Sequence, residues 1–185
     1  MATFTKIALK KSFIKLLDEH PLSQITVKDI VNECGVNRNT FYYYFEDIPT
    51  LLEDIVTEDA EKIIQQYPTV EKIEDCLNAI VENALLKKRA VLHIYNSVNR
   101  EIYEQYLWKV CDYVIGSYLI TILNGRKISE SDFNVIKRYF ESVGFGMISA
   151  WLTTGMTSDI RTFFSRICEI KSGMLEEMIS RCEIK

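Results

Sequence analysis

Hydrophobic residues recur three or four positions apart along almost the whole chain, with polar residues between them. In the first such segment, residues 3–20, the hydrophobic positions include Ile7, Ala8, Ile14 and Leu17. Pro21 follows the segment, where a helix has to end. No stretch alternates strictly between apolar and polar residues, as a half-buried strand would. Together with only 7 glycines and 3 prolines in 185 residues, this pattern predicts an all-α fold.

Two short helices joined by a tight turn are predicted next. Thr26 and Asp29 stand three positions apart, as in a capping box at a helix start. Gly35 ends this helix with a left-handed turn, and Asn37 caps a second helix over residues 38–45. A pair of short helices around a glycine turn is typical of a helix-turn-helix.

The remainder of the chain also has helical periodicity. Asp47 caps a connector helix that carries Pro49 in its first turn. The clearest breaks after it are Asn124-Gly125 and Gly155. We expect further helices at about residues 70–87, 90–97, 101–123, 129–154 and 158–181.

The segment from Ile25 to Val56 resembles the DNA-binding signature of the TetR (tetracycline repressor) family: a capped helix, a turn, a recognition helix with an aromatic end, and a long helix. The matching positions are Gly35, Val36, Thr40, Phe41, Tyr42, Tyr44, Phe45, Leu51 and Leu52. The resemblance implies a three-helix DNA-binding domain at residues 1–46. It also implies a helical domain at residues 47–185 that dimerises and senses a ligand.

On a helical wheel, Phe41 and Phe45 share one face of the recognition helix and should anchor it. Asn39, Thr40 and Tyr43 lie opposite, as residues that enter the major groove would. The candidate DNA-binding residues are Thr26, Lys28, Asn37, Arg38, Asn39, Thr40, Tyr42, Tyr43 and Tyr44. Two alternatives stay open: Thr26 and Asn37 act only as caps, and the lysines Lys6, Lys10 and Lys28 form a solvated face instead of attracting phosphates.

The chain departs from the family pattern at one position. Family members usually carry a lysine near the start of the connector helix, where it holds a phosphate; here that position is Ile48. Loss of one charged phosphate contact should lower DNA affinity and its salt dependence.

Charge and cysteine content narrow the function. The net charge of -4 argues against a chain coated with basic residues, although residues 1–46 hold six basic and five acidic side chains. Five scattered cysteines and the two histidines, His20 and His93, assemble no zinc or redox signature, so we expect no metal and no cofactor. No nucleophile and base, phosphate loop or HExxH pattern indicates an enzyme. Without a signal peptide or membrane span, the sequence predicts a soluble cytoplasmic protein with no membrane partner.

The last two predicted helices carry more apolar residues than one-sided burial needs. A homodimer through a four-helix bundle would bury the surplus, with an interface at Phe140, Ile148, Trp151, Phe163, Ile167 and Met174. An ordinary monomer core is the alternative.

Aromatic side chains with polar tips concentrate between residues 83 and 121. They could line a pocket for a small-molecule effector, with His93, Tyr95, Tyr103, Trp108 and Tyr113 as the candidates. The alternative is a plain hydrophobic core.

These patterns predict a DNA-binding transcriptional regulator, a one-component repressor that binds a palindromic operator as a dimer and responds to a small ligand. A co-activator of similar fold, controlled by a protein partner docked on the C-terminal domain, is the alternative. The sequence leaves the operator, the effector and the regulated genes open.

Overall fold

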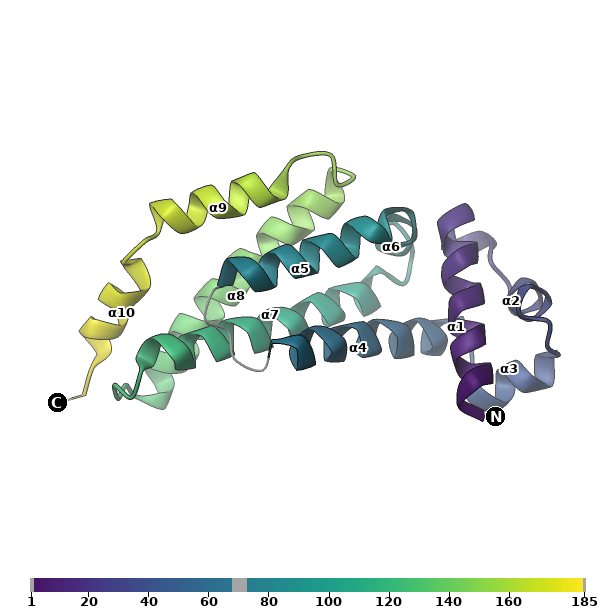
Figure 1. Ribbon diagram of the computed structural model, residues 1–185, viewed down its shortest axis with the longest axis horizontal. Helices are drawn as coiled ribbons and strands as arrows, with labels where there is room; N and C mark the ends of the chain where they lie inside the picture. The colour runs from purple at the N-terminus through teal and green to yellow at the C-terminus, as the bar shows by residue number, and fades with distance from the viewer. Residues whose placement is uncertain (1, 68–72, 185) are drawn as a thin grey trace. The chain divides into compact units, whose positions relative to one another are not determined.

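The computed structural model describes residues 2–67 and 73–184, and over these ranges the chain is helical with no strand (Figure 1). The all-α prediction is confirmed. The helices are α1 (Ala2–Glu19), α2 (Val27–Cys34), α3 (Arg38–Tyr44), α4 (Ile48–Gln66), α5 (Ile73–Leu86), α6 (Lys88–Tyr95), α7 (Arg100–Leu123), α8 (Glu130–Thr153), α9 (Ile160–Ile170) and α10 (Met174–Cys182), with a 3-10 turn at Leu22–Gln24.

The chain divides into two compact units. Unit 1 comprises the residues up to Asp59 together with Leu86–Tyr106, and unit 2 comprises Ala60–Leu85 and the residues from Leu107 onward. Unit 1 contains the segment predicted to bind DNA, residues 1–46, but also α6, because α6 packs against α1. A domain boundary after residue 46 stays a prediction.

Unit 1 is organised around α1. Leu9, Phe13 and Leu17 of this helix are fully buried or nearly so, as their spacing of four residues requires. Helices α2 and α6 pack against α1, and α3 packs against α2. Burial of this stripe therefore fixes the helix-turn-helix to one scaffold helix.

Unit 2 holds α5, most of α7, and α8 to α10. Part of its core is formed by Ile115 and Leu119 of α7, Ile136 of α8, and Leu175 and Ile179 of α10. Among the described residues, only α7 is long and apolar enough to cross a membrane by length and composition. Because α7 supplies two residues to this core, its hydrophobicity is that of a core helix.

The predicted final helix, residues 158–181, is wrong as a single element. Asp159 caps α9, which ends at Ile170, and Gly173 then adopts a φ of 79° before α10 begins. A left-handed residue interrupts helical hydrogen bonding, so the apolar periodicity continues across a real break. The helix expected over residues 70–87 is confirmed as α5 from Ile73 onward, and its first three positions lie outside the described residues.

Candidate nucleic-acid interface

The turn between α2 and α3 follows from three local interactions. Thr26 caps α2: its hydroxyl accepts from the Asp29 N–H at 3.3 Å, and the Asp29 carboxylate accepts from the Thr26 N–H at 2.9 Å. Gly35 then takes a φ of 72°, and the Val36 N–H donates to the Val31 carbonyl at 2.9 Å. The hydrogen bonds from Thr26 also lower the pKa of Asp29, so the cap stays ionised at neutral pH.

Helix α3 is anchored through one face. Phe41 and Phe45 are buried, with their ring centroids 5.8 Å apart. Asn37 begins the helix, because its Oδ1 accepts from the Thr40 N–H at 2.9 Å and from the Thr40 hydroxyl at 3.0 Å. These contacts leave the other faces of α3 open to solvent.

The exposed side of α3 carries Arg38, Asn39, Tyr42 and Tyr43. Tyr43 is 78% exposed, which is unusual for a large aromatic side chain. Within the described residues, neither Arg38 nor Asn39 makes a side-chain hydrogen bond or ion pair. Arg38 and Asn39, together with the exposed parts of Tyr42 and Tyr43, are therefore available to contact the edges of DNA bases.

The remaining candidates divide into caps and free groups. Thr26, Asn37 and Thr40 each have a structural task in helix capping, while Lys28 is exposed in the first turn of α2. Tyr44 is half-buried, and its ring packs edge-on against Tyr43 at 4.8 Å. Their contact with DNA stays a prediction.

Two lysines of α1 have partners inside unit 1. Lys6 binds Asp54 at 2.8 Å, and Lys10 binds Asp54 and Glu58, each at 2.5 Å. These ion pairs join α1 to α4. A lysine paired with carboxylates of its own fold attracts a phosphate less strongly. Within residues 2–67 and 73–184, the exposed Lys28 has no such carboxylate partner, unlike Lys6 and Lys10.

The residues predicted to line an effector pocket lie in two different units. In unit 1, His93 contacts the Leu17 carbonyl, the Tyr95 hydroxyl accepts from Arg100 at 2.6 Å, and Tyr103 is buried. In unit 2, Trp108 stacks on Phe145 at 4.5 Å, and the Tyr113 hydroxyl donates to the Tyr67 carbonyl at 2.8 Å. All five have internal partners, as core or connecting residues do.

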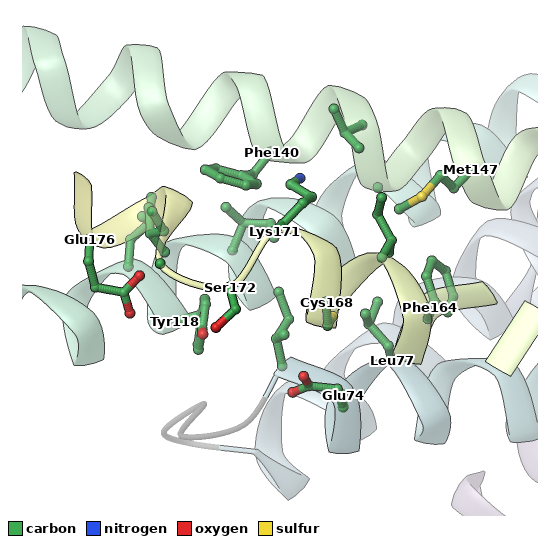
Figure 2. Close-up of a pocket in the computed structure, with 18 residues that line it drawn as sticks. Glu74, Leu77, Tyr118, Phe140, Met147, Phe164, Cys168, Lys171, Ser172 and Glu176 are labelled. Carbon is green, nitrogen blue, oxygen red and sulfur yellow. The ribbon is translucent and has the colours of Figure 1, made fainter. Parts of the chain in front are cut away.

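The structure has a cavity of about 250 Å³ elsewhere, inside unit 2 (Figure 2). Its walls come from α5, α7, α8, α9 and the start of α10, and none of the five predicted residues lines it. The sequence pattern did not indicate this cavity, because it predicts one continuous helix where the structure has α9 and α10. The signal was Gly173, a glycine inside an apparently continuous helix.

The residues predicted to form the dimer interface differ in how far they are buried within the single chain. Ile148 and Trp151 are each 4% exposed, and the Trp151 Nε1 donates to the Ser158 carbonyl at 3.0 Å, so both are core residues of the single chain. Phe140 and Ile167 line the cavity. Phe163, at 53% exposed, and Met174, at 36%, keep surface for a partner.

The site is thus a helix-turn-helix whose second helix offers an open polar face, carried on an all-helical chain. Residues 14–55 match the family model described as bacterial regulatory proteins, tetR family. Residues 71–173, more than half of the chain, match the model of a transcriptional regulator C-terminal region. The chain belongs to the tetR family: it is a DNA-binding transcriptional regulator and not an enzyme.

Solved structures with this fold include activators and repressors. The dihydroxyacetone kinase operon activator DhaS is 19% identical, with a TM-score of 0.75 over 97% of this chain and 98% of that chain. NalD, the secondary repressor of the MexAB-OprM multidrug efflux pump in Pseudomonas aeruginosa, is 15% identical, with a TM-score of 0.57 over 100% and 99%. A TetR transcriptional regulator from Streptococcus agalactiae is 18% identical, with a TM-score of 0.58 over 99% and 96%. No curated protein sequence matches this one.

Proposed function

We propose that the protein is a cytoplasmic homodimer that binds a palindromic operator through α3 and responds to a signal received by unit 2. The observation that carries this proposal is the division of α3 into two faces. Phe41 and Phe45 hold the helix, while Arg38, Asn39 and Tyr43 are exposed. Side chains at the start of a recognition helix contact base edges in the major groove.

Apolar groups left exposed on unit 2 support the homodimer. A soluble monomer seldom exposes so many large apolar side chains on neighbouring helices. On α7 to α10 these are Ile120, Val135, Tyr139, Phe163, Ile170 and Met174. A two-fold dimer would bury them and would carry two copies of α3, one for each half of a palindrome.

Repression is one form of this function: the protein alone occupies the operator and leaves it when a small ligand binds. The likeness to the repressor NalD supports this form. Activation with a protein partner docked on unit 2 is the second candidate. The likeness to the activator DhaS favours it, because that TM-score of 0.75 exceeds the 0.57 for NalD.

Nuclease protection on the region upstream of the protein's own gene tests the proposal. The pure protein should protect a palindrome, and Arg38→Ala and Asn39→Ala should each weaken binding by about 1 to 3 kcal/mol and relax base preference. Arg181→Ala, which removes an exposed arginine of α10, is the matched control and should bind as the parent does. If Arg38→Ala, Asn39→Ala and Tyr43→Ala all bind normally while folded, α3 does not enter the groove.

The same titration separates the two forms of regulation. A repressor of the first kind binds the operator without any addition. Protection that appears only when cell extract is added would favour the partner-dependent activator.

A further inference from the structure

The cavity in unit 2 is apolar over most of its wall. The apolar residues that line it include Leu77 of α5, Leu119 of α7, Met147 of α8 and Phe164 of α9. At roughly 30 Å³ for each water-sized group, 250 Å³ has room for about eight non-hydrogen atoms. The space therefore suits a small ligand with an apolar body, not a nucleotide or a peptide.

One cationic side chain lines this cavity. Lys171 is the C-cap residue that follows α9, and its Nζ lies 4.4 Å from the ring centroid of Phe140 and 5.7 Å from that of Tyr139. Figure 2 shows Lys171 beside Phe140 at the cavity. Across residues 2–67 and 73–184, no carboxylate forms an ion pair with it. Burial lowers the pKa of Lys171, as expected for an ammonium withdrawn from water without a counter-ion.

The carboxylates of the cavity are placed away from this lysine. Figure 2 shows Glu74 at the wall across from Lys171 and Glu176 at one end. Burial and then the nearby Glu74 carboxylate raise the pKa of Cys168 to about 11, so this thiol stays protonated at neutral pH. Two carboxylates near the cavity disfavour a ligand with several negative charges, such as a phosphate.

We propose that this cavity binds an unbranched or aromatic monocarboxylate of about eight carbons in total, whose carbons fill the space while its two oxygens reach Lys171. The carboxylate pairs with Lys171, and the apolar body lies along Phe140, Met147 and Phe164. Ser172 and Tyr118 offer hydroxyls at the same cavity. Binding of this ligand does not depend on the proposed function. Only the further step, that the ligand is the signal that modulates DNA binding, rests on the proposed function.

The turn that carries Lys171 links the ligand to regulation. Lys171, Ser172 and Gly173 join α9 to α10, and all three line the cavity. A carboxylate bound here would hold the end of α9, the helix that exposes Phe163 and Ile170. Occupancy would therefore bias the position of a helix in the proposed dimer surface.

Calorimetric titration of the full-length protein with sodium octanoate, without DNA, tests the binding step. We expect saturable binding with one site per chain, and a melting temperature that rises with octanoate concentration. Lys171→Met should weaken octanoate binding by about tenfold or more, because the charge-assisted contact is lost. Lys109→Met, which removes an exposed lysine of α7 outside the cavity, should bind as the parent does.

Two further measurements distinguish loss of the ligand contact from a folding defect, which would also weaken octanoate binding. Met147→Trp should fill the cavity and abolish octanoate binding while circular dichroism stays that of the parent. Lys171→Met, if folded, should keep its weak affinity for 1-octanol, which needs no cation. The proposal is overturned if octanoate does not saturate, if Lys171→Met binds octanoate as the parent does, or if 1-octanol or octylamine binds the parent as tightly as octanoate.

The two proposals fail separately. A protein that binds octanoate but protects no operator would refute the proposed function and keep the cavity as a ligand site. A protein that protects its operator but gives no octanoate isotherm would refute only the ligand.

Discussion

His93 of α6 completes the hydrogen bonding of α1, because its Nδ1 lies 2.6 Å from the carbonyl oxygen of Leu17. In a continuing helix this carbonyl would accept from the N–H four residues later. That residue is Pro21, which has no N–H. A carbonyl can only accept, so His93 carries its proton on Nδ1 and serves as a cap supplied by another helix. His93 therefore has a structural task in unit 1, and it is not among the residues that line the cavity of unit 2.

Replacement of His93 tests this cap. His93→Ala should lower the free energy of unfolding by about 1 to 3 kcal/mol, because the Leu17 carbonyl loses its donor in a partly buried place. Urea denaturation followed by circular dichroism measures the change. His20→Ala removes the other, exposed histidine and should leave the midpoint where it is. Equal midpoints for both variants would mean that water satisfies the carbonyl.

The ion pairs of Asp54 should make stability depend on pH. Burial raises the pKa of Asp54, but hydrogen bonds from Lys10 and Lys6 outweigh it and hold the pKa below its ordinary value of 3.8. The folded state therefore binds this proton less readily than the unfolded chain does. The resulting stabilisation is complete above pH 3.8 and is lost as the pH falls through the lowered pKa.

Asp54→Asn should be less stable than the parent by about 1 kcal/mol near neutral pH. The difference should stay constant above pH 3.8 and shrink as the pH is lowered further, in chemical denaturation at each pH. Asp18→Asn, at an exposed aspartate of α1, is the control. A difference that does not change with pH would show that the Asp54 pairs do not link α1 to α4 in solution.

Asn37 combines a cap with a predicted DNA contact, and two substitutions separate these tasks. Asn37→Ala should destabilise the fold by about 1 kcal/mol, whereas Asn37→Ser should restore stability because a serine hydroxyl also caps α3. Operator affinity should stay low in Asn37→Ser, because the amide Nδ2 that could donate to DNA is absent. If Asn37→Ser binds the operator as tightly as the parent does, Asn37 acts only as the cap of α3.

Contacts between the protein and the phosphates of the DNA backbone should make the DNA affinity depend on salt concentration. Lys28→Ala should weaken binding to operator and random DNA alike and should lower the slope of log K against log salt by about one. Ile48→Lys should do the opposite, since it adds a charge at the first residue of α4. Fluorescence anisotropy at several salt concentrations measures both. Unchanged slopes would place Lys28 and position 48 away from the phosphates.

Phe163 and Trp151 should respond differently to the same charge. Phe163→Glu places the charge on exposed surface and should yield a folded monomer, if the proposed dimer forms through α8 and α9. Trp151→Glu places it in the core, removes the hydrogen bond to Ser158, and should unfold unit 2. Light scattering and circular dichroism distinguish the outcomes. A dimer mass in folded Phe163→Glu would exclude this residue from the interface.

Much of the helix-turn-helix could be predicted because its determinants are close together in the sequence. The caps at Thr26 and Asn37 and the left-handed turn at Gly35 each depend on residues within four positions. Phe41 and Phe45 share a face because the helix repeat places them there. Neither their burial nor their partners had to be known to predict which side of α3 is anchored.

The partners of long side chains were decided only by the tertiary structure. Lys10 binds α4 carboxylates 44 and 48 positions away, His93 caps a helix 76 positions away, and Trp151 is buried within its own chain. Gly173, which breaks a helix whose apolar periodicity is uninterrupted, is one of the residues that line the cavity. Periodicity reports which face of a helix is apolar, and it is the same whether that face meets a core, a cavity or a second subunit. Only the packing of helices that are distant in the sequence decides which of these three surroundings an apolar face has.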